Sequence, residues 1–160
     1  MDKKKVYLAS PLGFNEIGRK FYYQELIPML ESSGLRVLDP WKSTPPATIH
    51  SVQNMPYGQE KKEAWEKLNK EIGENNRKYL DDCDCILAVL DGIDVDSGTA
   101  SEIGYGFAVG KLIVGYRGDF RLSSDNEGSI VNIQVEYFIR KSGGDIVADI
   151  GNAIELIKTT

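Results

Sequence analysis

Short apolar runs alternate along the chain with longer segments in which apolar residues recur at helical spacing. The candidate strands are 6–10, 36–38, 85–90, 112–116 and 145–148. The candidate helices are 14–33, 60–80, 99–109, 130–140 and 149–158. Strands that alternate with helices form βαβ units and hence a parallel sheet. The pattern predicts an α/β fold, a three-layer α/β/α sandwich with a roughly five-stranded parallel sheet (flavodoxin/Rossmann-like), in one domain over 1–160.

Three segments add detail to this scheme. The run 85–90 is almost wholly apolar, as expected of a central parallel strand covered on both faces. The stretch 41–57 loses periodicity and is rich in Pro, Ser, Thr and Asn, and a connection of this length is often functional. Gly73 is a weak point inside its helix and predicts a break or kink there.

Composition narrows the classes of partner. The net charge of -5 over 160 residues argues against a nucleic acid or an anionic membrane, since both attract a positive face. No run is apolar for long enough to cross a bilayer, and the basic start lacks the apolar region of a signal peptide, so we expect a cytoplasmic protein. Cys83 and Cys85 are one residue apart and are expected to be reduced thiols, and a single histidine makes a zinc site improbable. We expect no metal and no cofactor.

The loop after the central strand carries the candidate chemistry. It contains Asp91, Asp94 and Asp96, and Glu102 is expected in the first turn of the helix that follows. Ligands of open parallel sheets bind at the carboxyl ends of the strands, near the point where strand order reverses. The partial positive charge of the helix N-terminus favours the ionised form of a carboxyl there, and an ionised carboxylate suits attack on an anomeric carbon. A second carboxyl about 5 Å away can stabilise or protonate the leaving group. The alternative is a capping box, Thr99-x-x-Glu102, in which the glutamate only satisfies backbone donors.

Two further patterns have open interpretations. Gly104, Gly106 and Gly110 lie within or after the helix rather than in the strand-to-helix turn, so they favour close helix packing over dinucleotide binding. Phe14 and Trp41 could stack on a base from two sides, or simply pack.

The longer motif Asp96-x-Gly98-Thr99-x-x-Glu102-x-Gly104-x-x-x-Ala108-x-Gly110-Lys111 resembles the signature of the nucleoside 2-deoxyribosyltransferase family. The resemblance covers nearly the whole chain. It includes the opening Val6-Tyr7-Leu8-Ala9-Ser10-Pro11, an asparagine eight residues before Asp84, and the late segment Val131-Asn132-Ile133-Gln134.

The resemblance implies roles for individual residues. Glu102 matches the nucleophile that attacks C1′ of deoxyribose, Asp96 the carboxylate beside it, and Tyr7 the tyrosine that orients the nucleophile. Asn132 matches an asparagine that reaches a sugar hydroxyl from a neighbouring subunit, which implies a homo-oligomer. The residues expected to bind substrate are Ser10, Phe14, Asn76, Gly98, Asn132 and Gln134. From pattern alone, Tyr7 could equally be a core residue and Asn132 a helix cap.

Some positions depart from the family pattern. Asn76 stands where some relatives have an aspartate that protonates the base, so this chain must use Asp96 or another group. Gln134 replaces a methionine of some relatives, and 41–57 does not align. The expected function is exchange of the base of a 2′-deoxynucleoside. One alternative is a 2′-deoxynucleoside 5′-monophosphate N-glycosidase, in which Ser10, Arg19 or loop backbone amides would donate hydrogen bonds to the phosphate. The other is a non-catalytic nucleoside- or nucleotide-binding module.

Overall fold

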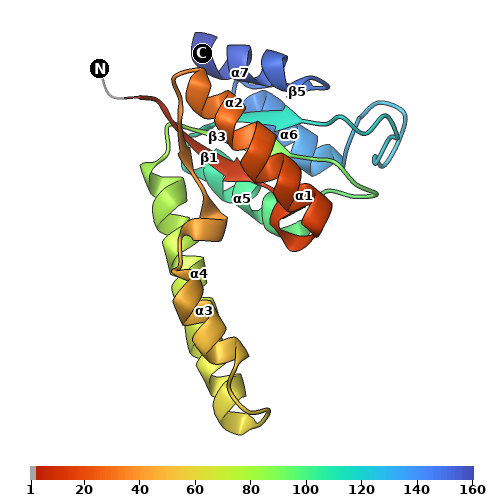
Figure 1. The fold of residues 1–160 in the computed structure, drawn as a ribbon. Coiled ribbons are helices and arrows are strands. Elements are labelled where there is room, and N and C mark those ends of the chain that lie inside the picture. Colours follow the sequence, from red (N-terminus) through yellow and green to blue (C-terminus); the bar gives the residue numbers. More distant parts are fainter. Residues whose placement is uncertain (1–2) are drawn as a thin grey trace.

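The computed structural model describes residues 3–160 and contains a five-stranded parallel sheet in the order β2-β1-β3-β4-β5 (Figure 1). The strands are β1 (Lys5–Ala9), β2 (Arg36–Leu38), β3 (Cys85–Val89), β4 (Leu112–Tyr116) and β5 (Ile146–Val147). The α-helices are α1 (Glu16–Phe21), α2 (Ile27–Ser32), α3 (Pro46–Gln53), α4 (Gln59–Asp82), α5 (Ser97–Ala108), α6 (Ile133–Lys141) and α7 (Ile150–Thr159). The short 3-10 helices are η1 (Pro11–Phe14) and η3 (Pro40–Lys42), and η2 (Tyr22–Leu26) is a π-helix.

Helices cover both faces of the sheet, so the predicted three-layer α/β architecture is confirmed (Figure 1). The segment α1–η2–α2 and helix α7 pack on one face, against Val6, Leu8 and Leu87. Helices α4, α5 and α6 pack on the other, against Ile86 and Ala88. All five residues of β3 are buried, as its apolar run predicted.

The two cysteines lie in the two different layers. Cys85 belongs to the core on the α7 side, and Cys83, which follows the end of α4, belongs to the core on the α5 side. Both are free thiols, as expected, and the sheet separates their side chains.

The helix predicted over 14–33 is found over 16–32, with a π-helical turn at its centre. Asn15 caps its start by accepting a hydrogen bond from the N–H of Gly18 at 2.7 Å. Within η2 the backbone hydrogen bonds span five residues instead of four, so the N–H of Ile27 donates to the carbonyl of Tyr22. Pro28 follows directly and has no N–H to donate, which explains why regular α-helical bonding is interrupted here.

The segment 41–57 is not the irregular connection that its composition predicted. It contains the last two residues of η3 and the whole of α3, which lies beside the first half of α4 and extends with it away from the sheet (Figure 1). The weak periodicity of α3 concealed it, because Val52 is its one buried residue. The predicted break at Gly73 is also wrong, since α4 continues through this residue for 24 residues in all. Within residues 3–160, no helix combines the length and apolar character needed to span a bilayer.

Two glycines in helices test this packing in opposite directions. Gly73 is exposed, and an added Cβ would meet no atom within 4 Å, so Gly73→Ala should raise the free energy of unfolding by about 0.5–1 kcal/mol. At Gly106 a Cβ would lie 2.2 Å from Cδ1 of the buried Ile86, so Gly106→Ala should lower the free energy of unfolding by about 1–3 kcal/mol. Urea unfolding measures both values. A loss of stability in the Gly73 variant would contradict the continuous α4.

Candidate active site

A cavity of about 310 Å³ lies at the carboxyl ends of β1 and β2 and beside the loop that follows β3. This is where strand order reverses, because the chain passes from β1 to β2 on one side and β3 lies on the other. The cavity is lined by Ser10, Phe14, Pro40, Trp41, Ile72, Asn76, Asp96, Gly98, Thr99 and Glu102.

Glu102 is the central acid of this cavity. It lies on α5, is half-buried, and its Oε1 accepts a hydrogen bond from the Tyr7 hydroxyl at 2.5 Å. Burial raises the pKa of Glu102 from 4.5 to about 7; the Tyr7 hydrogen bond opposes this rise and the charge of Asp96 adds to it. The expectation that the helix N-terminus keeps Glu102 ionised therefore has to be corrected, because burial is the larger effect.

Tyr7 is both a core residue and a hydrogen-bond donor, so the two interpretations of its position are compatible. Its side chain is fully buried on the α5 side of β1. Burial, followed by the charge of Glu102, raises the pKa of Tyr7 well above its usual range, so its hydroxyl stays protonated. A fixed donor on the central sheet thus holds the Glu102 carboxyl in place.

Asp96 begins α5 and also lines the cavity. Its Oδ2 accepts hydrogen bonds from the N–H of Thr99 at 3.0 Å and from the Thr99 hydroxyl at 3.4 Å. The helix therefore begins at Ser97, two residues before the predicted start, and Glu102 lies in its second turn. The capping-box interpretation is wrong, because Thr99 is inside the helix and Asp96 is the cap.

The opposite wall of the cavity comes from the ends of β1 and β2. The Ser10 hydroxyl accepts a hydrogen bond from the N–H of Leu12, and the Ser10 carbonyl accepts one from the indole of Trp41. Phe14 and Trp41 contact each other edge to face, with ring centroids 4.7 Å apart at 90°. Because the rings touch, they cannot hold a base between them. Gly13 permits this contact, since a Cβ there would lie 2.2 Å from the Trp41 ring.

Asn76 reaches the cavity from α4. Its Oδ1 lies 3.0 Å from the Ser43 hydroxyl, which also lies 2.8 Å from the Pro40 carbonyl. Asn76 is thereby tied to the segment after β2. Its amide can donate or accept a hydrogen bond but supplies no acidic proton.

The remaining two candidates lie outside this cavity. Asn132 caps α6 by accepting hydrogen bonds from the N–H groups of Gln134 and Val135, and it lines a second hollow with Ile93 and Asp94. Gln134 is exposed on α6. Within one copy of the chain, the structure thus brings together Glu102, Asp96, Tyr7, Ser10, Phe14, Asn76 and Gly98 but not Asn132 or Gln134.

Sequence reasoning missed part of the lining. Ile72 gives no signal, because an apolar residue in a polar helix is typical of ordinary packing. Pro40 could have been found, since Asp39-Pro40 follows a strand at the edge where ligands bind. Among residues 3–160, no group of three or more His, Cys, Asp or Glu side chains is arranged to hold a metal ion.

Comparison with known proteins gives this geometry a context. The chain is similar in fold to a conserved protein from Enterococcus faecalis V583, with a TM-score of 0.74, 21% identity and 98% of each chain covered. It is also similar to a 2-desoxiribosyltransferase from Leishmania mexicana, with a TM-score of 0.67, 22% identity and 97% of each chain covered. A CMP N-glycosidase from Clostridium botulinum has a TM-score of 0.56 at 18% identity, over 98% of this chain and 100% of that one.

These structures share the fold, and a match of the sequence itself identifies the family. Residues 6–134 match the family described as nucleoside 2-deoxyribosyltransferase. They run from the second residue of β1 to the start of α6 and include all the residues of the cavity. The chain belongs to the nucleoside 2-deoxyribosyltransferase family.

Proposed function

We propose that the protein is a nucleoside 2-deoxyribosyltransferase, which exchanges the base of a 2′-deoxynucleoside through a covalent deoxyribosyl-Glu102 intermediate. The observation that carries the proposal is the Glu102 carboxyl at the cavity, held at 2.5 Å by a fully buried tyrosine. A helix cap or a surface carboxylate has no need of such a partner. Members of the family act on the N-glycosidic bond of nucleosides, which this arrangement suits.

Under the proposal, the reaction has two steps. The Glu102 carboxylate attacks C1′, the bond between C1′ and the base nitrogen breaks, and the base leaves with the bonding electrons. A nitrogen of a second base then attacks C1′ and releases Glu102. Tyr7 keeps the carboxylate in one orientation before the first step and after the second, when it is free. Exclusion of water from the cavity decides whether the intermediate is transferred or hydrolysed.

The proton needed by the leaving base has to come from a group other than Asn76. Asp96 is the second acid of the cavity, and both of its hydrogen bonds to Thr99 use Oδ2. Under the proposal its other oxygen serves the substrate, either by binding the sugar or by passing a proton to the base. Asn76 then contacts the base through its amide alone.

The proposal includes a second copy of the chain. Asn132 lies outside the cavity of its own copy, on a hollow formed with Asp94. A neighbouring copy that presents Asn132 to the cavity would add a hydrogen-bonding group for the sugar hydroxyl, as the family pattern implies. The expected assembly is a dimer or a higher oligomer in the cytoplasm, with nucleosides and free bases as its small-molecule partners.

A hydrolase acting on 2′-deoxynucleoside 5′-monophosphates is the second candidate, and Arg19 favours it. The guanidinium of Arg19 donates to the carbonyl of Gly13, the residue before Phe14 of the lining, so a cation lies near the cavity. Against this, the lining within residues 3–160 contains two carboxylates and no lysine or arginine. A phosphate placed in the cavity would be repelled, which favours an uncharged nucleoside.

Replacing the nucleophile separates catalysis from stability. Glu102→Gln should lower the rate of base exchange by at least about 1,000-fold, since no carboxylate remains to attack C1′. The same variant should be more stable than the wild type at high pH. Below pH 4.5 Glu102 is protonated in both the folded and the unfolded protein, so its ionisation does not change the free energy of unfolding. Above pH 7 Glu102 is ionised in both states, and the folded wild type is destabilised because it must hold a buried charge.

The stability advantage of Glu102→Gln over the wild type should therefore appear as pH rises from 4.5 to 7. A pKa of about 7 instead of 4.5 corresponds to a difference of about 3 kcal/mol in the free energy of unfolding. Urea unfolding at pH 4.5 and pH 8 measures it, and an exchange assay with deoxyadenosine and free cytosine measures the activity. Near wild-type exchange in a folded Glu102→Gln variant would rule out the proposed nucleophile.

Removing the tyrosine hydroxyl should move the pH dependence. Glu102 must be ionised to attack, so the rate should fall as pH drops through about 7. The Tyr7 hydrogen bond favours the carboxylate; without it the pKa of Glu102 rises, and the acid limb of kcat/KM in Tyr7→Phe should shift to higher pH. Tyr22→Phe is the matched control, because Tyr22 is equally buried but donates to Asp39. A shift to lower pH in Tyr7→Phe would contradict this role.

A substrate panel distinguishes the three functions. Deoxyadenosine with a free base should give exchange, and dAMP alone should release little adenine, because the cavity lacks a cation. Release from dAMP without exchange, lost in Arg19→Ala, would establish the hydrolase instead. Tight binding of deoxyadenosine with neither reaction would identify a binding module. Chromatography of the bases and calorimetry of binding are the two measurements.

A further inference from the structure

Arg117 is a buried cation at the carboxyl end of β4, outside the cavity. Only 3% of Arg117 is exposed, and none of the ion pairs found among residues 3–160 includes it. A buried charge without a carboxylate partner is unfavourable unless other polar groups surround it. Its position therefore calls for an explanation.

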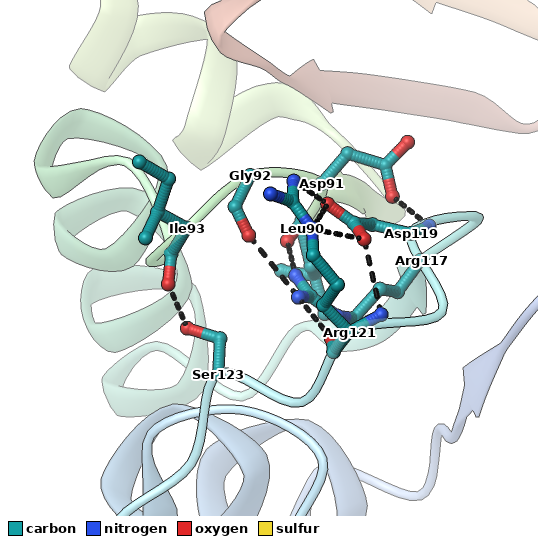
Figure 2. A network of polar contacts seen from close by, with 8 residues as sticks. All are labelled: Leu90, Asp91, Gly92, Ile93, Arg117, Asp119, Arg121 and Ser123. Carbon is teal, nitrogen blue, oxygen red and sulfur yellow. Dashed lines mark hydrogen bonds and ion pairs between the residues drawn. The ribbon is translucent and has the colours of Figure 1, made fainter.

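Backbone carbonyls provide that surrounding. The guanidinium of Arg117 donates to the carbonyl of Leu90, to that of Gly92 at 3.1 Å, and to that of Arg121 at 2.6 Å (Figure 2). Leu90 and Gly92 follow β3, whereas Arg121 belongs to the segment that follows β4. The planar guanidinium thus joins two neighbouring loops at three points, which the point charge of a lysine would not reproduce.

Two more hydrogen bonds tie the same loops together (Figure 2). The N–H of Asp119 donates to Oδ1 of Asp91 at 2.8 Å, and the hydroxyl of Ser123 donates to the carbonyl of Ile93 at 2.7 Å. The side chains of Ile93 and Asp94 point to solvent, so apolar burial contributes little to holding these residues. Val95, by contrast, is buried in the core on the α5 side. The segment 117–123 thus supports the loop between β3 and α5 from Leu90 to Ile93, and apolar packing supports only its end.

This loop ends at Asp96, the cap of α5 and a wall of the cavity. We propose that Arg117 is a positioning residue of the candidate active site, whose guanidinium holds the 91–95 loop so that the Asp96 carboxylate lies at the cavity shared with Glu102. The proposal rests on the proposed function, because it assigns Asp96 a place in the reaction. Arg117 itself does not line the cavity, and the hydrogen bonds of its guanidinium go to Leu90, Gly92 and Arg121, which do not line it either.

The test compares two arginines in the same segment. Arg117→Lys keeps the charge but loses the three-point contact. Arg121→Lys is the matched control, because the Arg121 side chain is exposed and pairs with Asp119, a pairing that lysine can also make. Ser123→Ala is a milder variant that removes one tie to the loop and serves if Arg117→Lys does not fold.

Two readouts do not depend on catalysis. Amide hydrogen exchange of 91–96, followed by mass spectrometry, should be about tenfold faster in Arg117→Lys than in Arg121→Lys, the factor expected for one lost charge-assisted hydrogen bond. Carbon NMR titration of Glu102, assigned by its loss in Glu102→Gln, should show a lower pKa, because a displaced Asp96 and added water both favour the carboxylate. Equal exchange and equal titration in the two variants would overturn the proposal.

Base-exchange kinetics complete the experiment. In Arg117→Lys, kcat should fall about tenfold or more with a smaller change in KM, since the loop positions a reacting group rather than the substrate as a whole. Wild-type protein without any base exchange would refute the proposed function, while hydrogen exchange and the Glu102 titration would still decide the role of Arg117. Faster loop exchange with unchanged kcat in an active enzyme would refute the positioning role.

Discussion

The order of the strands determines where this protein can bind a ligand. From β1 the chain crosses to β2 through α1 and α2 on one face of the sheet, and it reaches β3 through α4 on the other face. With crossovers of one hand, neighbouring loops at this point diverge instead of covering the strand ends. The gap between these loops is the cavity. Tyr7 and Glu102 meet beside it because the Tyr7 side chain lies on the face of the sheet that α5 covers.

Burial and the helix terminus act on Glu102 in opposite directions, and their magnitudes decide the outcome. A charge near a helix N-terminus gains about 0.3–1 kcal/mol, and the effect falls off within the first turn. A pKa of about 7 instead of 4.5 corresponds to about 3 kcal/mol in favour of the neutral form. Glu102 also lies in the second turn, beyond most of the helix effect. The hydrogen bond from the Tyr7 hydroxyl lowers the pKa of Glu102, so that the ionised carboxylate is populated near neutral pH.

Much of the fold could be predicted from the sequence, because apolar runs and helical spacing reflect burial directly. The strands at 36–38 and 112–116 have the predicted bounds. Helix α3 could not be predicted, since it packs on α4 outside the main core and its sequence carries little periodicity. Helix α5 begins two residues before its predicted start. Asp96 and Thr99 are both good caps, and only the backbone shows which one is used.

The site was predictable where it depends on elements close in sequence or on a family motif, and less so where distant segments meet. Asp96 caps α5, and Gly98 and Glu102 lie on this helix, so one motif locates all three. Ser43 and Asn76 are 33 residues apart, and their contact follows from α4 passing beside the end of β2. No local pattern encodes that contact.

The support of the acidic loop follows from a property of parallel sheets. At the carboxyl edge, carbonyl groups point outward without strand partners, and the loop after β3 adds Asp91, Asp94 and Asp96 to this edge. Apolar packing secures only the end of this loop, where Val95 is buried in the core, because Ile93 and Asp94 before it are exposed. The guanidinium of Arg117 secures the rest of the loop through backbone carbonyls. It offsets the negative edge and leaves the Asp96 carboxylate free to cap α5 and face the cavity. The buried charge of Arg117 is thus offset by the carbonyls that it binds and by the acids near them.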